Sequence, residues 1–382
     1  MMVIARKNLW VGLMTGALLL GVINLNLTSL WQIISNTLTN SSILFMAISV
    51  GLIPVLGAIL EESSLIDNLL DSIQMKSKLF IGLTPAFLGM LTMPGGALLS
   101  APVIKKAGDD IKNVDYTAIN VWYRHILVMV YPLGPLLPTT KMAGLDLYTE
   151  VLYLLPFFGL LFLLGHFFII NNISSSHEIQ GKVDIKKILI PILITICAPV
   201  LHITQISLLP ILSELALFIS VILTLIIAFH LSNTSYSKFI PYLKKMRAWK
   251  YGLIILGMFL FLNIFKATEL SSALENIHLS KTLLIVVFGG LIGFITGRTQ
   301  LGISIILPIY LAKYGQAELN YLSFTLLFFS VFVGYIFSPI HPCVTVSVEY
   351  FNSSLKNLYR KIFIPIMIAL GVAAVISFII IN

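Results

Sequence analysis

The chain reads Tyr131-Pro-Leu-Gly-Pro-Leu-Leu-Pro138, and 204 positions later it reads Tyr335-Ile-Phe-Ser-Pro-Ile-His-Pro342. Both stretches follow the pattern Tyr-x-x-small-Pro-aliphatic-x-Pro inside strongly apolar sequence. Proline lacks a backbone N–H and clashes with the preceding helical turn, so each stretch interrupts a helix. Two matching interruptions indicate an internal repeat.

The same offset aligns other parts of the chain. The matched pairs are Gly89 with Gly293, Thr92 with Thr296, Ser100 with Ser304, and Asp71-Ser72-Ile73 with Glu275-Asn276-Ile277. We therefore predict two repeats, 1–170 and 207–382, joined by 171–206, which holds a linker loop and an extra transmembrane helix. Each repeat is expected to contain a re-entrant hairpin (about 78–104 and 282–310) and a broken helix (about 116–140 and 322–347).

Composition places the chain in a membrane. Hydrophobic residues make up 58% of it and charged residues 10%, against about 25% charged in soluble domains. A helix needs about 20 apolar residues to cross a bilayer. The long apolar blocks are Leu9–Leu27, Ile43–Leu60, Val151–Ile170, Ile188–Leu201, Leu208–Phe229, Tyr251–Phe265 and Ile362–Ile381. We predict an all-α, polytopic membrane protein whose first block is a retained helix, since it lacks a signal-peptide cleavage site.

The basic residues predict the orientation. With the N-terminus in the cytoplasm, the outer stretches hold only Lys141, Lys266, Lys281 and Lys313. Two arginines fall at membrane depth, and the other eighteen basic residues lie in cytoplasmic stretches. The positive-inside rule thus explains the net charge of +8 without a nucleic-acid partner. We expect a cell-membrane protein with its C-terminus outside.

The repeats must have opposite orientations, because an odd number of crossings separates equivalent helices. Inverted repeats recur in secondary transporters, whose binding site lies at the repeat interface near mid-membrane. Backbone breaks at that depth survive only where protein, water or substrate satisfies the freed groups. The alternative is that the breaks are ordinary proline kinks and helix ends.

The breaks define the candidate site. Hairpin tips can present amides to an anion, and unwound carbonyls and hydroxyls can hold a small cation. The predicted substrate-binding residues are Thr92, Gly95, Gly96, Thr296, Arg298, Thr299, Gln300, Ser338 and His341. The predicted ion-coupling residues are Gly134, Pro135, Thr139, Thr140, Pro339, Cys343 and Thr345. No catalytic residue, metal ligand or cofactor is predicted, apart from sodium or a proton as coupling ion.

Arg298 is the most informative single residue. An arginine at the bilayer centre costs about 2.5–3.5 kcal/mol on insertion scales, and its guanidinium suits a carboxylate or phosphate. The alternatives are that it snorkels to water or pairs with a distant glutamate. Arg124 and His125 follow Trp122 and Tyr123, so we favour their interpretation as markers of the membrane interface, with a functional role as the alternative.

His341 is either a proton carrier or a plain hydrogen-bonding residue. Neither Cys197 nor Cys343 has the spacing of a disulfide framework or metal site.

These features resemble the ion transporter superfamily, which includes divalent anion/sodium symporters, citrate and gluconate permeases, arsenite exporters and the membrane subunits of tripartite carboxylate transporters. Within it, the chain is most similar to a prokaryotic family of integral membrane proteins of unknown function. The residues carrying the resemblance are Thr92-Met-Pro-Gly-Gly-Ala97, Thr296-Gly-Arg-Thr-Gln300 and Ser338-Pro-Ile-His-Pro-Cys343.

The resemblance implies a fixed scaffold and a moving part that carries substrate by an elevator motion, commonly in a homodimer. It also implies a site between the two tips and the two broken helices. The symporters of that superfamily carry Ser-Asn-Thr at both tips, which this chain lacks. Sodium coupling and a dicarboxylate substrate are therefore open, whereas Arg298 favours some anion.

We expect a secondary active transporter of a small anionic solute, an organic acid foremost. A passive channel is the first alternative, but channels usually arrange repeats around the membrane normal. An intramembrane enzyme is the second, but the chain has no His-Glu-x-x-His or Gly-x-Ser-x-Gly motif. The pair Glu61-Glu62 resembles the glutamate pair of prenyl-protein-type proteases. The arginine expected four positions after the second glutamate is replaced by Ile66.

Overall fold

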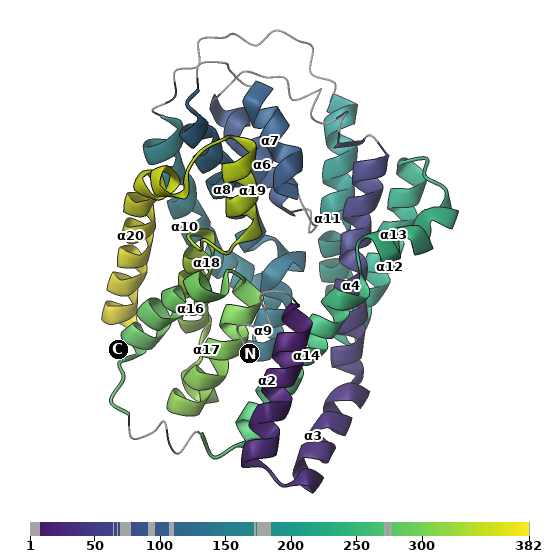
Figure 1. The fold of residues 1–382 in the computed structure, drawn as a ribbon. Coiled ribbons are helices and arrows are strands. Elements are labelled where there is room, and N and C mark those ends of the chain that lie inside the picture. The colour runs from purple at the N-terminus through teal and green to yellow at the C-terminus, as the bar shows by residue number, and fades with distance from the viewer. Residues whose placement is uncertain are drawn as a thin grey trace.

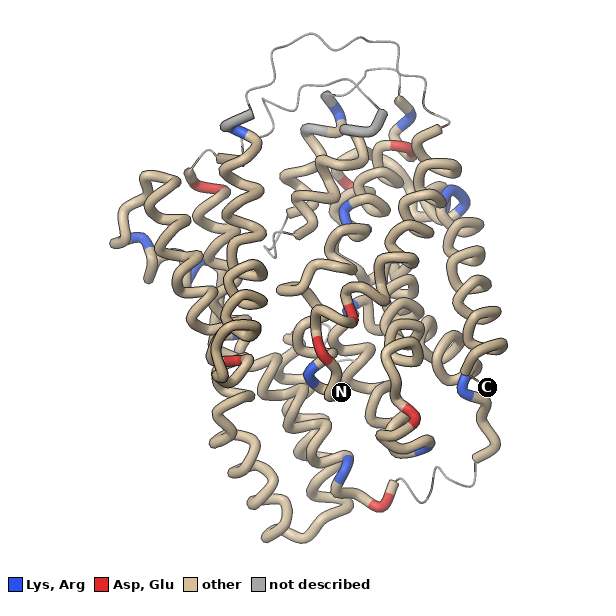
Figure 2. Tube along the Cα trace, turned by 180° about the vertical axis from the view of Figure 1, so that it is seen from behind, with Lys and Arg blue, Asp and Glu red and all other residues tan. Residues whose placement is uncertain are grey.

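The computed structural model describes residues 8–63, 65–66, 68, 78–90, 96–106, 111–171, 173, 185–270, 273 and 277–381. Over these residues the chain is a bundle of helices without strands (Figure 1). Most of the helical length carries no charged residue (Figure 2). Six described helices are long and apolar enough to cross a membrane, or seven if the bent pair Asn113–Val130 and Pro132–Ala143 is one span. The prediction of an all-helical, multi-pass protein is confirmed.

The first helix group has seven members: α2 (Leu9–Asn24), α3 (Leu27–Thr39), α4 (Ser41–Glu62), α11 (Ile185–Leu208), α12 (Ser213–Leu231), α13 (Phe239–Lys245) and α14 (Trp249–Ala267). Asn26 and Asn40 begin α3 and α4, and each side chain accepts from a backbone amide three residues on. α2 packs along α14, and α12 along α4. Val22 and Ile23 are among many exposed apolar side chains, as expected for a surface that meets lipid.

The second helix group lies beside the first in Figure 1. Its helices are α6 (Lys78–Met90), α7 (Gly96–Lys106), α8 (Asn113–Val130), α9 (Leu137–Ala143), α10 (Leu147–Gly165), α16 (Gly289–Thr296), α17 (Thr299–Tyr314), α18 (Tyr321–Ile336), α19 (Pro342–Tyr350) and α20 (Leu355–Ile380). The segment Pro132–Leu136 leads from α8 into α9, His166–Ile170 continues α10, and Leu283–Phe288 leads into α16. α6 and α7 occupy the upper half of the view, whereas α16 and α17 occupy the lower half.

Glycines allow the closest packing in the second group. A Cβ built on Gly89 of α6 would lie 1.8 Å from the Arg124 carbonyl oxygen of α8. A Cβ on Gly293 of α16 would lie 2.0 Å from the Val331 carbonyl oxygen of α18. Small residues commonly let membrane helices approach this closely. The pairs α6–α8 and α16–α18 therefore touch backbone to backbone.

Two interruptions split helices near the middle of this group. α8 and the segment Pro132–Ala143 meet at 58°, and Gly134 between them has non-helical backbone angles (φ −86°, ψ −152°). The second interruption separates α18 from α19 at 337–341. Both coincide with the proline-rich stretches of the sequence, because proline cannot donate to the helical ladder.

Polar contacts join the two groups on the α11 side. Pro199 cannot donate to the Thr195 carbonyl one turn earlier, and the Tyr131 hydroxyl donates to that carbonyl instead, at 2.8 Å. Tyr148 of α10 donates to the Pro199 carbonyl at 2.9 Å. Lys141 of α9 forms an ion pair of 2.5 Å with Glu214 of α12, whose side chain is buried. These bonds fix how the second group sits against the first.

Candidate functional site

A cavity of about 240 Å³ lies between the two helix groups. The first group contributes Val50, Ile53 and Tyr251 from α4 and α14, and the other lining residues come from the second group. These are Gly89, Arg124, His125, Val128, Leu133, Gly134, Pro135, Gln300, Tyr335 and Cys343. Pieces of α6, of α17 and of both broken helices thus meet at one point.

The cavity is electropositive. Arg124 lines it, and no Asp or Glu is among its described lining residues. No described ion pair includes Arg124, although its side chain is only 5% exposed. An unneutralised guanidinium in a poorly hydrated cavity strongly favours an anionic ligand.

The position of Arg124 is fixed by the start of α7. Its Nη1 donates to the Gly96 carbonyl at 2.7 Å and to the Ser100 hydroxyl at 3.4 Å. A Cβ on Gly96 would lie only 2.0 Å from Nη2, so the guanidinium rests directly on this glycine. The guanidinium also lies close enough to the Cys343 side chain, which lines the same cavity, to interact with it electrostatically. Arg124 therefore connects the first hairpin to the second broken helix.

A buried amide holds these segments in register. Asn120 of α8 donates to the Ala97 carbonyl at 3.1 Å and to the Ser347 hydroxyl at 2.9 Å. It also accepts from the Ser100 hydroxyl at 2.5 Å. Asn120 and its two side-chain partners, Ser100 and Ser347, are fully buried. The network ties α7, α8 and α19 together one helical turn before Arg124 in α8.

Arg298 lies beside this cavity. It is the residue before α17, it is half-buried, and it lies near the lining residues Tyr251 and Tyr335. No described ion pair includes it. Two arginines, one from each half of the chain, therefore contribute positive potential to the same region.

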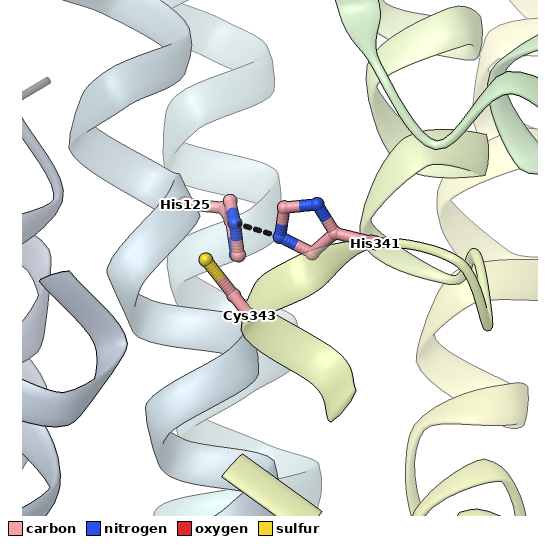
Figure 3. Close-up of side chains that lie close together, drawn as sticks. All are labelled: His125, His341 and Cys343. Atoms are coloured by element: carbon pink, nitrogen blue, oxygen red, sulfur yellow. Dashed lines mark hydrogen bonds between the residues drawn. The ribbon is translucent and has the colours of Figure 1, made fainter. Parts of the chain in front are cut away.

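Three side chains with metal-type donor atoms meet at the cavity. The donor atoms of His125, His341 and Cys343 all lie within 4.8 Å of one another, and Figure 3 shows the two imidazoles joined edge to edge beside the sulfur. The two Nε2 atoms are 2.9 Å apart. These three side chains could geometrically hold a soft metal ion. The nearby guanidinium groups, together with a described lining that holds no carboxylate, disfavour a cation there.

Several buried polar atoms at the second hairpin tip lack a partner in the described part of the chain. They are Thr299 Oγ1, Ser338 Oγ and His341 Nδ1. Each side chain is at most 3% exposed, and buried polar groups are normally hydrogen-bonded. Gly297, with its left-handed φ of +58°, brings the tip against the break, where its Cβ would lie 3.0 Å from Ser338 Oγ. The tip and the break together hold unused hydrogen-bonding capacity for a ligand.

The residues predicted from sequence fall into distinct groups. Gly134, Pro135, Gln300 and Cys343 line the cavity, whereas Gly96 supports Arg124. The hydroxyls of Thr139, Thr140 and Thr296 donate to carbonyls of their own helical segments. Pro339 is half-buried in the break, and Thr345 is exposed on α19, so neither is brought to the cavity wall. Thr92 and Gly95 lie outside the described residues.

Arg124 and His125 lie inside the bundle, whereas residues that mark a membrane interface usually lie on the surface that faces lipid. Both are buried, at 5% and 2% exposure, and both line the cavity. The adjacent Trp122 is also inside the protein and donates to the Leu161 carbonyl at 2.9 Å. The aromatic residues beside the pair belong to helix packing. The signal in the sequence was a charged residue followed by a histidine in the middle of α8, which indicates a buried polar site as well as an interface.

Comparisons with known proteins agree with this architecture. A family model described as "Protein of unknown function (DUF401)" matches residues 2–381. The solved structure of the YdaH transporter from Alcanivorax borkumensis, reported to have an unusual topology, is similar with a TM-score of 0.53. The similarity covers 96% of this chain and 95% of that one at 11% identity, so it concerns the fold. No curated protein matches.

Proposed function

Because the chain belongs to the DUF401 family and shares the fold of a membrane transporter, we propose that it is a secondary active transporter of a small anionic solute. An organic acid or other carboxylate is the favoured substrate class. Sodium or a proton is the coupling ion, and the protein resides in the cell membrane with its N-terminus in the cytoplasm and its C-terminus outside. By its resemblance to the ion transporter superfamily, it works as a homodimer.

One observation carries the anionic substrate: among the described residues that line the cavity between the helix groups are Arg124 and no carboxylate. A guanidinium can bind a carboxylate or phosphate through two parallel hydrogen bonds. Arg298 supplies a second cation beside Tyr251 and Tyr335. The volume of about 240 Å³ suits a molecule of a few carbon atoms.

The spacing of the helices supports inverted repeats. Shifted by 204 residues, α6 and α7 would start at 282 and 300, close to the starts of Leu283–Phe288 and of α17. The packing pairs correspond as well, since α6 lies on α8 as α16 lies on α18. In Figure 1 the pair α6 and α7 lies in the upper half of the molecule, and the pair α16 and α17 lies in the lower half. This is the arrangement expected of two re-entrant hairpins with opposite orientation.

The proposed cycle moves the second helix group against the first. The cavity lies between them, so a displacement of the second group would carry the substrate with it while α4 and α14 stay in place. Alternating access by such rigid-body motion is common among inverted-repeat transporters. The first group would then be the scaffold and would provide the dimer contact.

The test is a thermal-stability panel. Detergent-purified protein is melted with carboxylates and inorganic oxyanions, in sodium or potassium and at two pH values. A ligand at 100 times its Kd stabilises the native state by about 2.7 kcal/mol. We expect one anion class to raise the melting temperature of the wild type and not of Arg298→Gln. Stabilisation by cations or neutral solutes alone would refute the anionic substrate.

A further inference from the structure

The two imidazoles of the cavity have fixed roles in their shared hydrogen bond. His125 Nδ1 contacts the Val121 carbonyl one turn earlier in α8. A carbonyl oxygen carries no proton, so Nδ1 must be the donor and Nε2 of the neutral ring must be an acceptor. His341 Nε2, 2.9 Å away, must therefore donate to His125 Nε2. This assignment leaves His341 Nδ1 without a proton.

His341 Nδ1 is an empty proton site. It is buried and has no hydrogen-bond partner in the part of the chain described. The backbone of Gly297, at the second hairpin tip, lies beside the His341 ring, and its carbonyl would accept a hydrogen bond from Nδ1 once that nitrogen is protonated. One proton added at Nδ1 would turn His341 into an imidazolium while both other ring contacts stay intact. The pair can thus take up one proton without rearranging.

The groups around the pair oppose this charge unless an anion is present. Arg124 faces it from α8 and Arg298 from the second hairpin tip, and both interact with His341 through their charges. Tyr335 of α18 packs against the His341 ring at a centroid distance of 4.2 Å. Cys343 of α19 completes the cluster, and the facing residue of α14 is Tyr251. None of these groups is a carboxylate, so the counter-charge has to come from the ligand.

We propose that the His125–His341 pair is the coupling site of the transporter and binds one proton together with each anion. The proton comes from water on the side where the anion enters, adds to the Nδ1 lone pair of His341, and leaves to water on the side where the anion is released. No bond within the protein is made or broken besides this N–H. The proposal rests on the proposed function, and it selects the proton over sodium as coupling ion.

The proton site can be tested without transport. Protein labelled with [15N]histidine is reconstituted in liposomes, with and without potassium succinate or potassium phosphate. The ring nitrogens are followed by solid-state NMR between pH 8 and pH 5, with His341→Gln and His125→Gln for assignment. We expect an Nδ1–H tautomer for His125, an Nε2–H tautomer for His341, and a single proton taken up by the two rings. Two identical tautomers, or two protons taken up independently, would overturn the assignment.

Coupling is tested in proteoliposomes that contain a pH-sensitive dye, with inward gradients of potassium succinate or potassium phosphate and no sodium. We expect anion entry to acidify the interior with wild-type protein. His341→Gln should reduce this acidification at least tenfold, and His125→Gln serves if His341→Gln does not fold. Glu150→Gln is the matched control, because Glu150 is a buried acid that hydrogen-bonds Thr325 away from the cavity.

The outcomes separate the two proposals. Entry of radiolabelled succinate or phosphate without acidification would refute the coupling site and leave anion transport standing. Loss of acidification in Glu150→Gln rather than in the histidine variants would move the proton site to α10. If neither succinate nor phosphate enters, the transport proposal fails for both anions. The NMR titration then still decides whether the His125–His341 pair binds a proton.

Discussion

A methyl group added at Gly96 tests the role of Arg124 directly. In Gly96→Ala the new Cβ would lie 2.0 Å from Arg124 Nη2 and 2.9 Å from Cζ, whereas ordinary contacts begin at 3.4 Å. The guanidinium must therefore retreat by roughly 1.4 Å, the difference between the two contact distances. The clash involves the end of a flexible side chain, so we expect the variant to fold.

The displaced guanidinium loses its bond to the Gly96 carbonyl, now 2.7 Å long, and its position toward the anion. A hydrogen bond between the guanidinium and the bound anion contributes about 1.5–3 kcal/mol to the binding free energy. If that bond is lost, the Kd for the anion should rise roughly 10- to 150-fold. Isothermal titration calorimetry with the anion selected by the stability panel measures this change.

Gly159→Ala is the control, because a Cβ there meets nothing within 4 Å. It makes the same chemical change on α10, and we expect the Kd to stay within twofold of the wild type, about 0.4 kcal/mol. If Gly96→Ala binds the anion as tightly as Gly159→Ala, Arg124 does not contact the substrate and the electropositive cavity has another purpose.

Three further changes probe other parts of the argument. Arg298→Lys should keep part of the anion uptake and Arg298→Gln should abolish it, because lysine keeps the charge without the planar fork; equal uptake by both variants and wild type would exclude a substrate contact. Gly293→Ala places a methyl 2.0 Å from the Val331 carbonyl, and such overpacking should destabilise the protein by about 1–3 kcal/mol, seen as a lower melting temperature; an unchanged melting curve would show that α16 and α18 separate easily. Lys141→Glu should cost about 1–3 kcal/mol by leaving the buried Glu214 unpaired, and the double variant with Glu214→Lys should recover most of it in the same assay; no recovery would mean that the pair is not coupled.

Part of this architecture could be predicted from sequence because proline and glycine act locally. The stretches at Tyr131 and Tyr335 each place prolines three residues apart, whereas α4 and α20 continue through a single proline. The breaks at Gly134 and at 337–341 could therefore be expected from the local sequence. Apolar block length likewise predicts which helices can span a bilayer. Arg298 was conspicuous because nothing near it in the chain could neutralise its charge.

The contacts that make the site could not be predicted in this way. His125 and His341 are 216 positions apart, and no spacing rule relates two residues that meet only after α8 and α19 have packed. Arg124 was not expected in the site because aromatic neighbours usually mark a membrane interface, and here they pack inside the bundle. The sequence also does not show how the Thr139 hydroxyl is used. In the structure this hydroxyl donates to the Pro135 and Leu136 carbonyls, so its proton is already engaged within the helix.

The proline in α11 has a consequence for the speed of any cycle that displaces the second helix group. Because Pro199 leaves the Thr195 carbonyl vacant, Tyr131 finds an acceptor on a surface where a regular helix would offer none. The observed position of the second helix group is thus a local energy minimum. A displacement from it breaks the Tyr131 bond, the neighbouring Tyr148 bond and the Lys141–Glu214 pair together. Three bonds lost at once raise the activation barrier more than three lost in succession, so the carrier would dwell here and depart in discrete jumps.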